Sequence, residues 1–165
     1  MSAAQLKRSF PPVVDERTRV LVLGSLPGEE SLARQSYYAN PRNHFWRLMS
    51  AVIGAELVPL DYEARLQTLL SAGVGLWDSV GTASRDGSLD AAIRDHRPNA
   101  LAELARGLPQ LNAIGFNGGT SAKIGIKALA GATEAALIPL PSSSPAYTLA
   151  FEKKLEAWLQ LRDYL

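Results

Sequence analysis

The stretch Val20-Leu21-Val22-Leu23-Gly24-Ser25-Leu26-Pro27-Gly28 decides the fold of this chain. Its first four residues form a continuous apolar run, which is typical of a strand buried on both faces of a parallel sheet. The glycines and the proline that follow end this strand in a turn. Similar apolar runs at residues 74–80, 111–116 and 136–140 predict three further strands.

The segments between these runs have the spacing of amphipathic helices. Apolar residues recur at intervals of three and four within residues 43–53, which predicts a helix there. The other helices expected are a short one at residues 89–95 and longer ones at 61–72, 99–108, 117–130 and 149–164. Residues 1–16 are expected to be an irregular lead-in, and residues 81–88 a polar loop. Strands that alternate with helices predict a single α/β domain over residues 1–165, a three-layer α/β/α sandwich around a four-stranded, mainly parallel sheet.

The composition excludes several kinds of site. The chain has 165 residues, a formal net charge of +1, no cysteine and two histidines. It therefore has no disulfide and no thiolate metal site, and we expect no metal or organic cofactor. The N-terminus lacks the apolar core of a signal peptide, and no apolar run reaches about 18 residues. We therefore expect a cytoplasmic monomer with no membrane partner and no obligate protein partner.

The near-neutral net charge leaves nucleic-acid binding open, because a transient complex with DNA needs only a local basic face. Eight basic residues could form such a face, and each is equally compatible with an ordinary solvated surface. These residues are Arg34, Arg42, Arg47, Arg85, Arg94, Arg97, Lys123 and Lys127.

Residues 37–46 combine aromatic rings, amides, an arginine and a proline, a combination suited to handling a nucleobase. The last two rings fall on the core face of the expected helix, and Asn43 is placed to cap that helix. Either Tyr37 or Tyr38 could stack a base, and Asn40, placed before Pro41, is free to face the edge where the carboxyl ends of the strands meet, the usual ligand site in such sheets. A base stacked on an aromatic ring gains about 1–3 kcal/mol.

Other loops at this edge allow a functional and a structural interpretation. The turn at residues 24–28 is neither a dinucleotide-binding G-x-G-x-x-G motif nor a P-loop. The hydroxyls of residues 141–147 suit a phosphate, and a plain Ser/Pro connector fits equally well. Asn117 ends a strand and could reach a ligand, while Asp86 and Asp90 are the acids expected nearest the edge. No G-x-S-x-G motif or evident serine–histidine pair is present.

Several stretches together resemble the hypoxanthine-DNA glycosylase branch of the uracil-DNA glycosylase superfamily. They are residues 23–32 (LGSLPGEESL), 37–46 (YYANPRNHFW), 76–78 (LWD), 85–90 (RDGSLD), 115–118 (GFNG) and 140–145 (LPSSSP). The resemblance extends over about residues 17–160, nearly the whole chain. The last stretch is also similar to the serine-rich loop of the mismatch-specific uracil/thymine glycosylases.

The resemblance implies a monofunctional enzyme that flips a deaminated base out of DNA and hydrolyses its N-glycosidic bond. Most superfamily members position the attacking water with Asp or Asn in the first motif, where this chain has Leu26. The hypoxanthine branch is similar in lacking that residue, and its functional amide lies in the second motif, which corresponds to Asn40 here. This difference argues against strong uracil excision and favours a purine substrate or a water molecule held in a different way. The superfamily's last motif often holds a histidine that stabilises the leaving base, and residues 141–147 contain none.

The resemblance also implies a base pocket and a DNA-binding loop around Asn40. The expected base-pocket residues are Gly24, Ser25, Leu26, Pro27, Gly28, Tyr38 and Asn117. The expected DNA-binding residues are Arg42, Ser142, Ser143, Ser144, Pro145 and Tyr147. The implied partner is DNA with a damaged base, met at the nucleoid during base excision repair. A uracil/thymine mismatch glycosylase and a non-catalytic nucleic-acid or nucleotide binding module stay open as alternatives.

Overall fold

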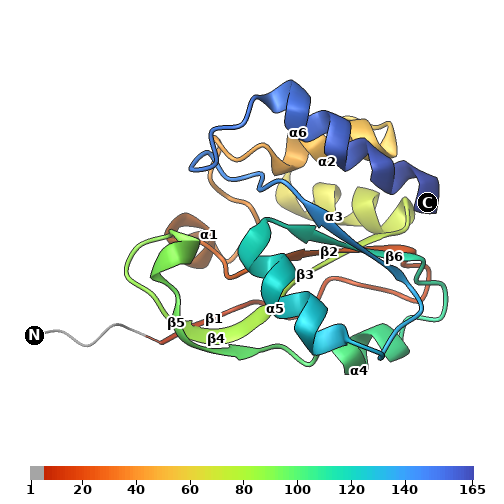
Figure 1. Cartoon of the computed structure of the whole chain (residues 1–165). Coiled ribbons are helices and arrows are strands. Elements are labelled where there is room, and N and C mark those ends of the chain that lie inside the picture. Colours follow the sequence, from red (N-terminus) through yellow and green to blue (C-terminus); the bar gives the residue numbers. More distant parts are fainter. Residues whose placement is uncertain (1–5) are drawn as a thin grey trace, which may run out of the picture.

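A four-stranded parallel sheet forms the centre of the molecule (Figure 1). The computed structural model describes residues 6–165. The strands are β2 (Val20–Gly24), β3 (Val74–Asp78), β6 (Ala113–Asn117) and β7 (Ala136–Leu140). They pair in the order β3-β2-β6-β7, with every neighbour parallel. The predicted four-stranded sheet is therefore confirmed, and β2, which carries the opening apolar run, is one of its two inner strands.

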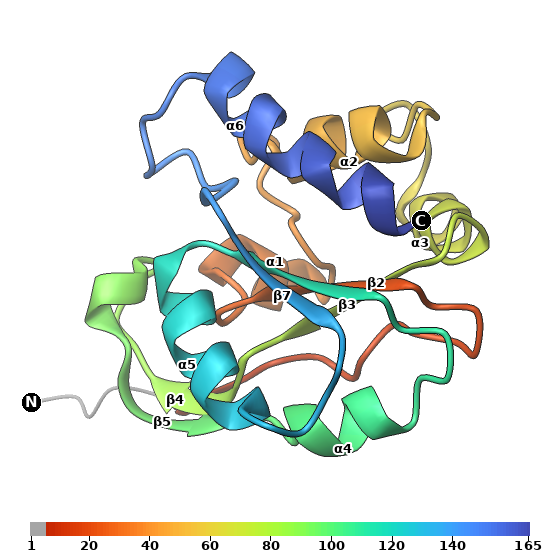
Figure 2. The same cartoon turned by 45° about the vertical axis from the view of Figure 1, so that its right-hand side comes forward.

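Helices cover both faces of this sheet and complete the three layers (Figures 1 and 2). One face carries α2 (Phe45–Ile53), α3 (Tyr62–Ser71) and α6 (Phe151–Trp158), and the other carries α4 (Leu101–Arg106) and α5 (Gly119–Leu129). Alternate residues of β2 supply the two cores. Val20 and Val22 pack with the first group of helices, whereas Leu21 and Leu23 pack with the second.

The remaining helical pieces are short. α1 (Glu29–Arg34) follows the turn after β2, a 3-10 turn spans Asp90–Ala92, and α6 continues as a second 3-10 segment over Leu159–Tyr164. The side chain of Asp61 accepts a hydrogen bond of 2.8 Å from the amide of Ala64, which caps α3 as predicted. Among residues 6–165, every helix is too short or too polar to cross a membrane.

A second, antiparallel sheet was not predicted from the sequence. It consists of β1 (Leu6–Arg8), β4 (Val80–Ser84) and β5 (Arg94–Pro98), paired in the order β1-β4-β5. Three predictions are therefore wrong: the lead-in contains a strand, the loop at 81–88 begins as a strand, and the helix at 89–95 is only a 3-10 turn. Every residue of β5 is exposed, so backbone pairing holds this strand without the apolar alternation that reveals strands in a sequence.

Candidate active site

Tyr38 is held in a fixed position at the edge where the parallel strands end. Its ring stacks on Phe45 with centroids 3.8 Å apart, and its carbonyl accepts a 3.1 Å hydrogen bond from the indole of Trp46. The backbone at Tyr38 has a φ of 53°, a left-handed conformation that is rare for an aromatic residue. Phe45 covers one ring face and the residue is half-buried, which is compatible with the predicted stacking of a base. Tyr37, by contrast, belongs to the core.

Asn40 lies two residues further along, in a turn that orients its side chain. Its Oδ1 accepts a 2.9 Å hydrogen bond from the amide of Arg42, which fixes this atom as the oxygen of the side-chain amide. The Nδ2 group donates to no protein atom among residues 6–165, and the side chain is half-exposed. Asn43 instead accepts from the amide of Phe45 at 2.9 Å, which confirms its predicted capping role. Asn40 thus presents a donor and a second oxygen lone pair to solvent.

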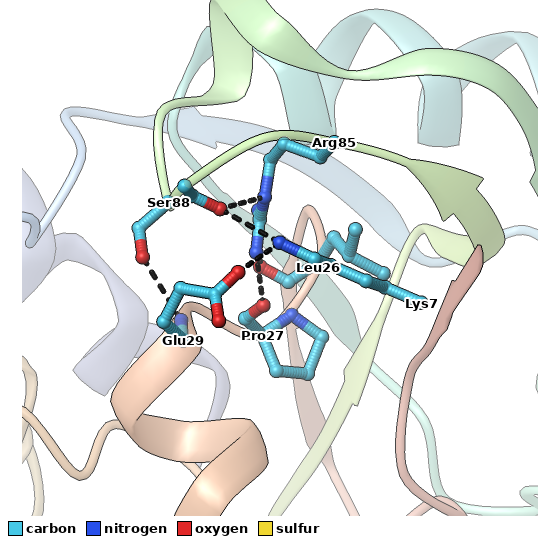
Figure 3. A network of polar contacts seen from close by, with 7 residues as sticks. Lys7, Leu26, Pro27, Glu29, Arg85 and Ser88 are labelled. Carbon is cyan, nitrogen blue, oxygen red and sulfur yellow. Dashed lines mark hydrogen bonds and ion pairs between the residues drawn. The ribbon is translucent and has the colours of Figure 1, made fainter. Parts of the chain in front are cut away.

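A buried arginine holds the turn after β2 in place (Figure 3). The guanidinium of Arg85 donates to the carbonyls of Leu26, at 3.3 Å, and Pro27, and its Nε donates to Gly87 at 2.9 Å. Arg85 is 1% exposed, so it cannot belong to the basic face expected from the sequence. The side chain of Leu26 packs against Val80 and Ala83, between the two sheets. It offers an incoming water no polar group.

An ion pair connects the same turn to β1. Lys7 forms an ion pair with Glu29 and donates to the carbonyl of Gly87 at 3.0 Å, while Ser88 Oγ accepts a 2.9 Å bond from the amide of Glu29 (Figure 3). The Lys7 contact lowers the pKa of Glu29. The second sheet therefore fixes the position of the turn that the sequence assigned to the base pocket.

Asp78 is an acid beside this pocket, and sequence reasoning placed it in a motif without giving it a role. Asp78 ends β3 beside Gly24, and a Cβ atom at Gly24 would lie 2.5 Å from Asp78 Oδ1 and 3.0 Å from the Tyr38 hydroxyl. Only glycine permits this close approach. Asp78 Oδ2 and the Tyr38 hydroxyl are buried without a hydrogen-bond partner among residues 6–165. Buried polar atoms of this kind are uncommon and point to a missing water or ligand.

Burial sets the protonation of this pair. It is the main cause of a rise in the pKa of Asp78 to about 8. The nearby carboxylate of Asp90 also raises this pKa, and the charge of Arg85 lowers it by a smaller amount. Burial also raises the pKa of the Tyr38 hydroxyl, with Asp78 adding to the effect. Asp90 accepts a 2.6 Å hydrogen bond from Ser25, and burial raises the pKa of this second carboxyl. At neutral pH, Asp78 and Tyr38 are therefore both neutral and both able to donate a hydrogen bond.

Asn117 joins β6 to the serine-rich loop at residues 141–147. Its Nδ2 donates to Ser143 Oγ and its Oδ1 accepts from the Ser143 amide, both at 2.8 Å. Ser143 is 1% exposed, so it does not present a hydroxyl to DNA, and its predicted direct contact is corrected to a bracing role. The Ser143 carbonyl accepts a 2.9 Å bond from the amide of His44, which brings this loop beside the segment that carries Asn40.

The other residues expected to bind DNA stay near the surface. Arg42 and Tyr147 are exposed, and Ser142, Ser144 and Pro145 are half-buried. Ser142 Oγ accepts from the amide of Ser144 at 3.1 Å, which tightens the loop. No cluster of three metal-ligating side chains occurs in the part of the chain that the structure describes. The site is therefore a polar edge of turns and side chains with one acidic end, at Asp78 and Asp90.

Comparison with known proteins identifies the family to which this edge belongs. Residues 11–164 match the family described as Uracil DNA glycosylase superfamily. The chain belongs to this superfamily. The match covers nearly the whole chain, so it confirms the resemblance drawn from the motifs and the glycosylase fold, and it places the chain among DNA glycosylases.

Individual proteins similar to this chain are also DNA glycosylases by name. Two curated proteins named hypoxanthine DNA glycosylase, from Methanosarcina acetivorans and Methanosarcina barkeri, are 47% and 42% identical over 68% of this chain. The matched regions cover 72% and 71% of those two proteins. A solution NMR structure of a candidate uracil DNA glycosylase from Methanosarcina acetivorans superposes with a TM-score of 0.85 at 39% identity, covering 96% of this chain and 97% of that one.

Proposed function

We propose that this protein is a monofunctional DNA glycosylase that excises a deaminated base, preferably hypoxanthine, from DNA. The observation that carries the proposal concerns the residue that positions the attacking water, a role that falls to Asn40 and not to Leu26. Leu26, where most members of the superfamily place a water-positioning side chain, packs into the core, whereas Asn40 has a partly exposed side-chain amide that a turn orients. The names of the two curated relatives support hypoxanthine as the substrate.

The nucleotide leaves the duplex before the reaction, at a cost of a few kcal/mol that is lowest for a mispair. The base then stacks on the open face of Tyr38, whose other face is already fixed against Phe45. Asn40 holds a water molecule near the sugar carbon, using its free Nδ2 and the second lone pair of Oδ1. Positioning suffices for this step, because the sugar cation that forms is strongly electrophilic.

The departing purine receives the electron pair of the broken glycosidic bond. The serine-rich loop has no histidine to stabilise that charge, but Asp78 is neutral at physiological pH and lies against Gly24 and the Tyr38 hydroxyl. In the proposed mechanism Asp78 donates a hydrogen bond or its proton to the ring of the leaving base. The attacking water releases a proton to solvent as its oxygen bonds to the sugar carbon, and solvent returns a proton to Asp78. A neutral carboxylic acid in a buried site is well suited to donation of this kind.

The alternative substrate class is uracil or a mismatched thymine, which the serine-rich loop and the likeness to the candidate uracil DNA glycosylase structure favour. A panel of duplexes with one hypoxanthine, uracil, xanthine or G·T mismatch separates the possibilities in single-turnover base-release assays. We expect hypoxanthine to be released fastest. Release of uracil alone would contradict the branch assignment, and no release from any duplex would favour a non-catalytic binding module.

A borohydride trapping experiment tests the monofunctional assignment. Water is the proposed nucleophile, so no imine forms between the enzyme and the sugar, and we expect no covalent adduct with inosine-containing DNA. A trapped adduct would show that a lysine attacks the sugar and would overturn the hydrolytic mechanism.

A further inference from the structure

A cluster of basic side chains lies behind the serine-rich loop, away from the acidic end of the site. The Nζ atom of Lys154, on α6, donates to the carbonyl of Ser144 at 3.2 Å and lies 3.4 Å from His44 Nδ1. Arg47, one turn further along α2, places its guanidinium 4.0 Å from the ring centre of Phe151. The His44 ring packs edge-on against the same phenylalanine, with centroids 5.2 Å apart. Three basic groups from α2 and α6 therefore share one small region.

This cluster has no acidic partner. Lys154 has no accessible surface, yet it forms no ion pair with a carboxylate among residues 6–165, and neither do His44 and Arg47. Burial lowers the pKa of Lys154, and it lowers that of His44 together with the charges of Lys154 and Arg47. A buried ammonium without a counter-charge is costly, and structural lysines of this kind are almost always paired.

The location of the cluster indicates which anion would complete it. The loop that covers Lys154 presents Ser142 and Ser144, and the exposed ring of Tyr147 lies 5.6 Å from the Lys154 ammonium. The same loop is hydrogen-bonded to the start of α2, four residues beyond Asn40. An anion bound here would therefore sit beside the nucleotide on which Asn40 acts.

We propose that Lys154, supported by His44 and Arg47, forms a binding site for one phosphodiester of the DNA backbone next to the flipped nucleotide. The inference rests on the proposed function, since that function supplies the DNA. An ammonium nitrogen has three N–H donors, and Ser144 and His44 engage at most two of them, so one remains for a phosphate oxygen. Movement of the Tyr147 ring opens the path, and the phosphate supplies the counter-charge that residues 6–165 do not provide.

The test measures DNA affinity over a salt series, using a duplex with an abasic-site analogue so that no base needs to be released. Neutralising one phosphate with a basic side chain contributes about −0.9 to the slope of log K against log salt concentration. Lys154→Met should therefore weaken binding at low salt by at least about tenfold and make the slope less steep by about one. Arg47→Gln, at an exposed position where folding is not at risk, should change affinity and slope in the same direction by a smaller amount.

Lys153 is the matched control. It is the neighbouring residue on α6, its side chain is 70% exposed, and its nitrogen lies 3.9 Å from Glu156. Lys153→Met should leave affinity within about twofold and the slope unchanged, since an exposed pair contributes little. Excess inorganic phosphate at constant ionic strength shows whether the site takes free phosphate. Competition that disappears in the Lys154→Met protein would support the site, and equal competition in both proteins would place the anion elsewhere.

Two results would overturn the proposal. If Lys154→Met binds DNA with the wild-type salt slope, Lys154 is a structural brace of the loop. If borohydride traps an adduct in the wild type that Lys154→Met abolishes, this lysine is a nucleophile and not a phosphate ligand. Failure of the proposed function gives a different result from these two. If the protein releases no hypoxanthine but its DNA binding keeps a salt slope that depends on Lys154, the substrate assignment is wrong and the phosphate site stands.

Discussion

Asn40 and Asn43 are three residues apart and show how the same side chain serves two purposes. Asn43 caps α2 through the Phe45 amide, and Asn40 closes a turn while its amide nitrogen donates to no atom of residues 6–165. Asn40→Ala should therefore reduce the single-turnover rate of base excision at least about tenfold, because the water loses its position, with DNA affinity nearly unchanged. Wild-type rates in this variant would remove Asn40 from the chemistry.

Asn43→Ala supplies the matched comparison for that experiment. Loss of a helix cap should lower the free energy of unfolding by about 1 kcal/mol, measured by chemical denaturation. Its excision rate at a temperature where the variant is folded should stay close to that of the wild type. A large loss of rate in Asn43→Ala would mean that the whole turn, and not one amide, positions the water.

Asp78 makes the stability of the protein depend on pH, and the direction of this dependence follows from its raised pKa. Its pKa is raised to about 8 in the folded protein, so the folded state holds a proton that the unfolded state has released between about pH 4 and pH 8. The stability contributed by this group is fully present below that interval and is lost as the pH rises through 8. The loss approaches about 1.4 kcal/mol per pH unit within the interval.

Asp78→Asn should flatten this dependence, because the amide does not titrate. Urea denaturation of both proteins from pH 5 to pH 9 should show the variant gaining stability relative to the wild type as the pH rises. Asp86→Asn, at an exposed position shortly after β4, serves as the control. Parallel pH profiles for wild type and Asp78→Asn would contradict a proton held on Asp78.

At the scale of elements, the serine-rich loop depends on β6 for its shape. Asn117 makes two hydrogen bonds to Ser143, and all the groups involved are buried. Asn117→Ala leaves the Ser143 hydroxyl and amide without these partners, which should lower the free energy of unfolding by about 2–4 kcal/mol. Limited proteolysis should then cut within residues 141–147 faster than in the wild type.

A smaller effect would assign Asn117 mainly to the base pocket. A variant with wild-type stability and a reduced excision rate would mean that its amide contacts the ligand rather than the loop. Ser143→Ala is the variant to compare with Asn117→Ala, because it removes the hydroxyl and keeps the backbone amide that Asn117 also binds. It should cost less than Asn117→Ala.

At the scale of the molecule, Arg85 connects the two sheets. It lies at the end of β4, in the antiparallel sheet, and donates to carbonyls of the turn that follows β2, in the parallel sheet. Arg85→Leu removes donors from three carbonyl groups and should lower the free energy of unfolding by at least about 2 kcal/mol. Base excision should also fall at temperatures where the protein is folded, because the turn beside Asp78 loses its support.

Arg94→Leu is the control for that experiment. Arg94 is exposed on β5, and within residues 6–165 it donates to the nearby carbonyls of Ala91 and Ile93, at 2.8 and 2.9 Å. Its replacement should change stability by less than about 0.5 kcal/mol. If both substitutions lower the free energy of unfolding equally, the hydrogen bonds of Arg85 do not help to attach the second sheet.

The sequence by itself determined the parallel sheet, the helices that cover it and the segment that carries Asn40. Each buried strand needs a continuous apolar run and each helix an apolar stripe, so the pattern along the chain records them directly. The cap at Asn43 and the core position of Phe45 follow from the same local rules. These features depend on residues that are close together in the chain.

Only the tertiary structure decided the second sheet, the buried proton on Asp78 and the burial of Lys154 without a carboxylate partner among residues 6–165. β5 is held by backbone pairing with no apolar pattern, and Arg85 meets Pro27 across 58 residues of chain. The pKa of Asp78 and the burial of Lys154 depend on how completely distant segments enclose these groups. Enclosure is a property of packing in three dimensions, and no local spacing of residues encodes it.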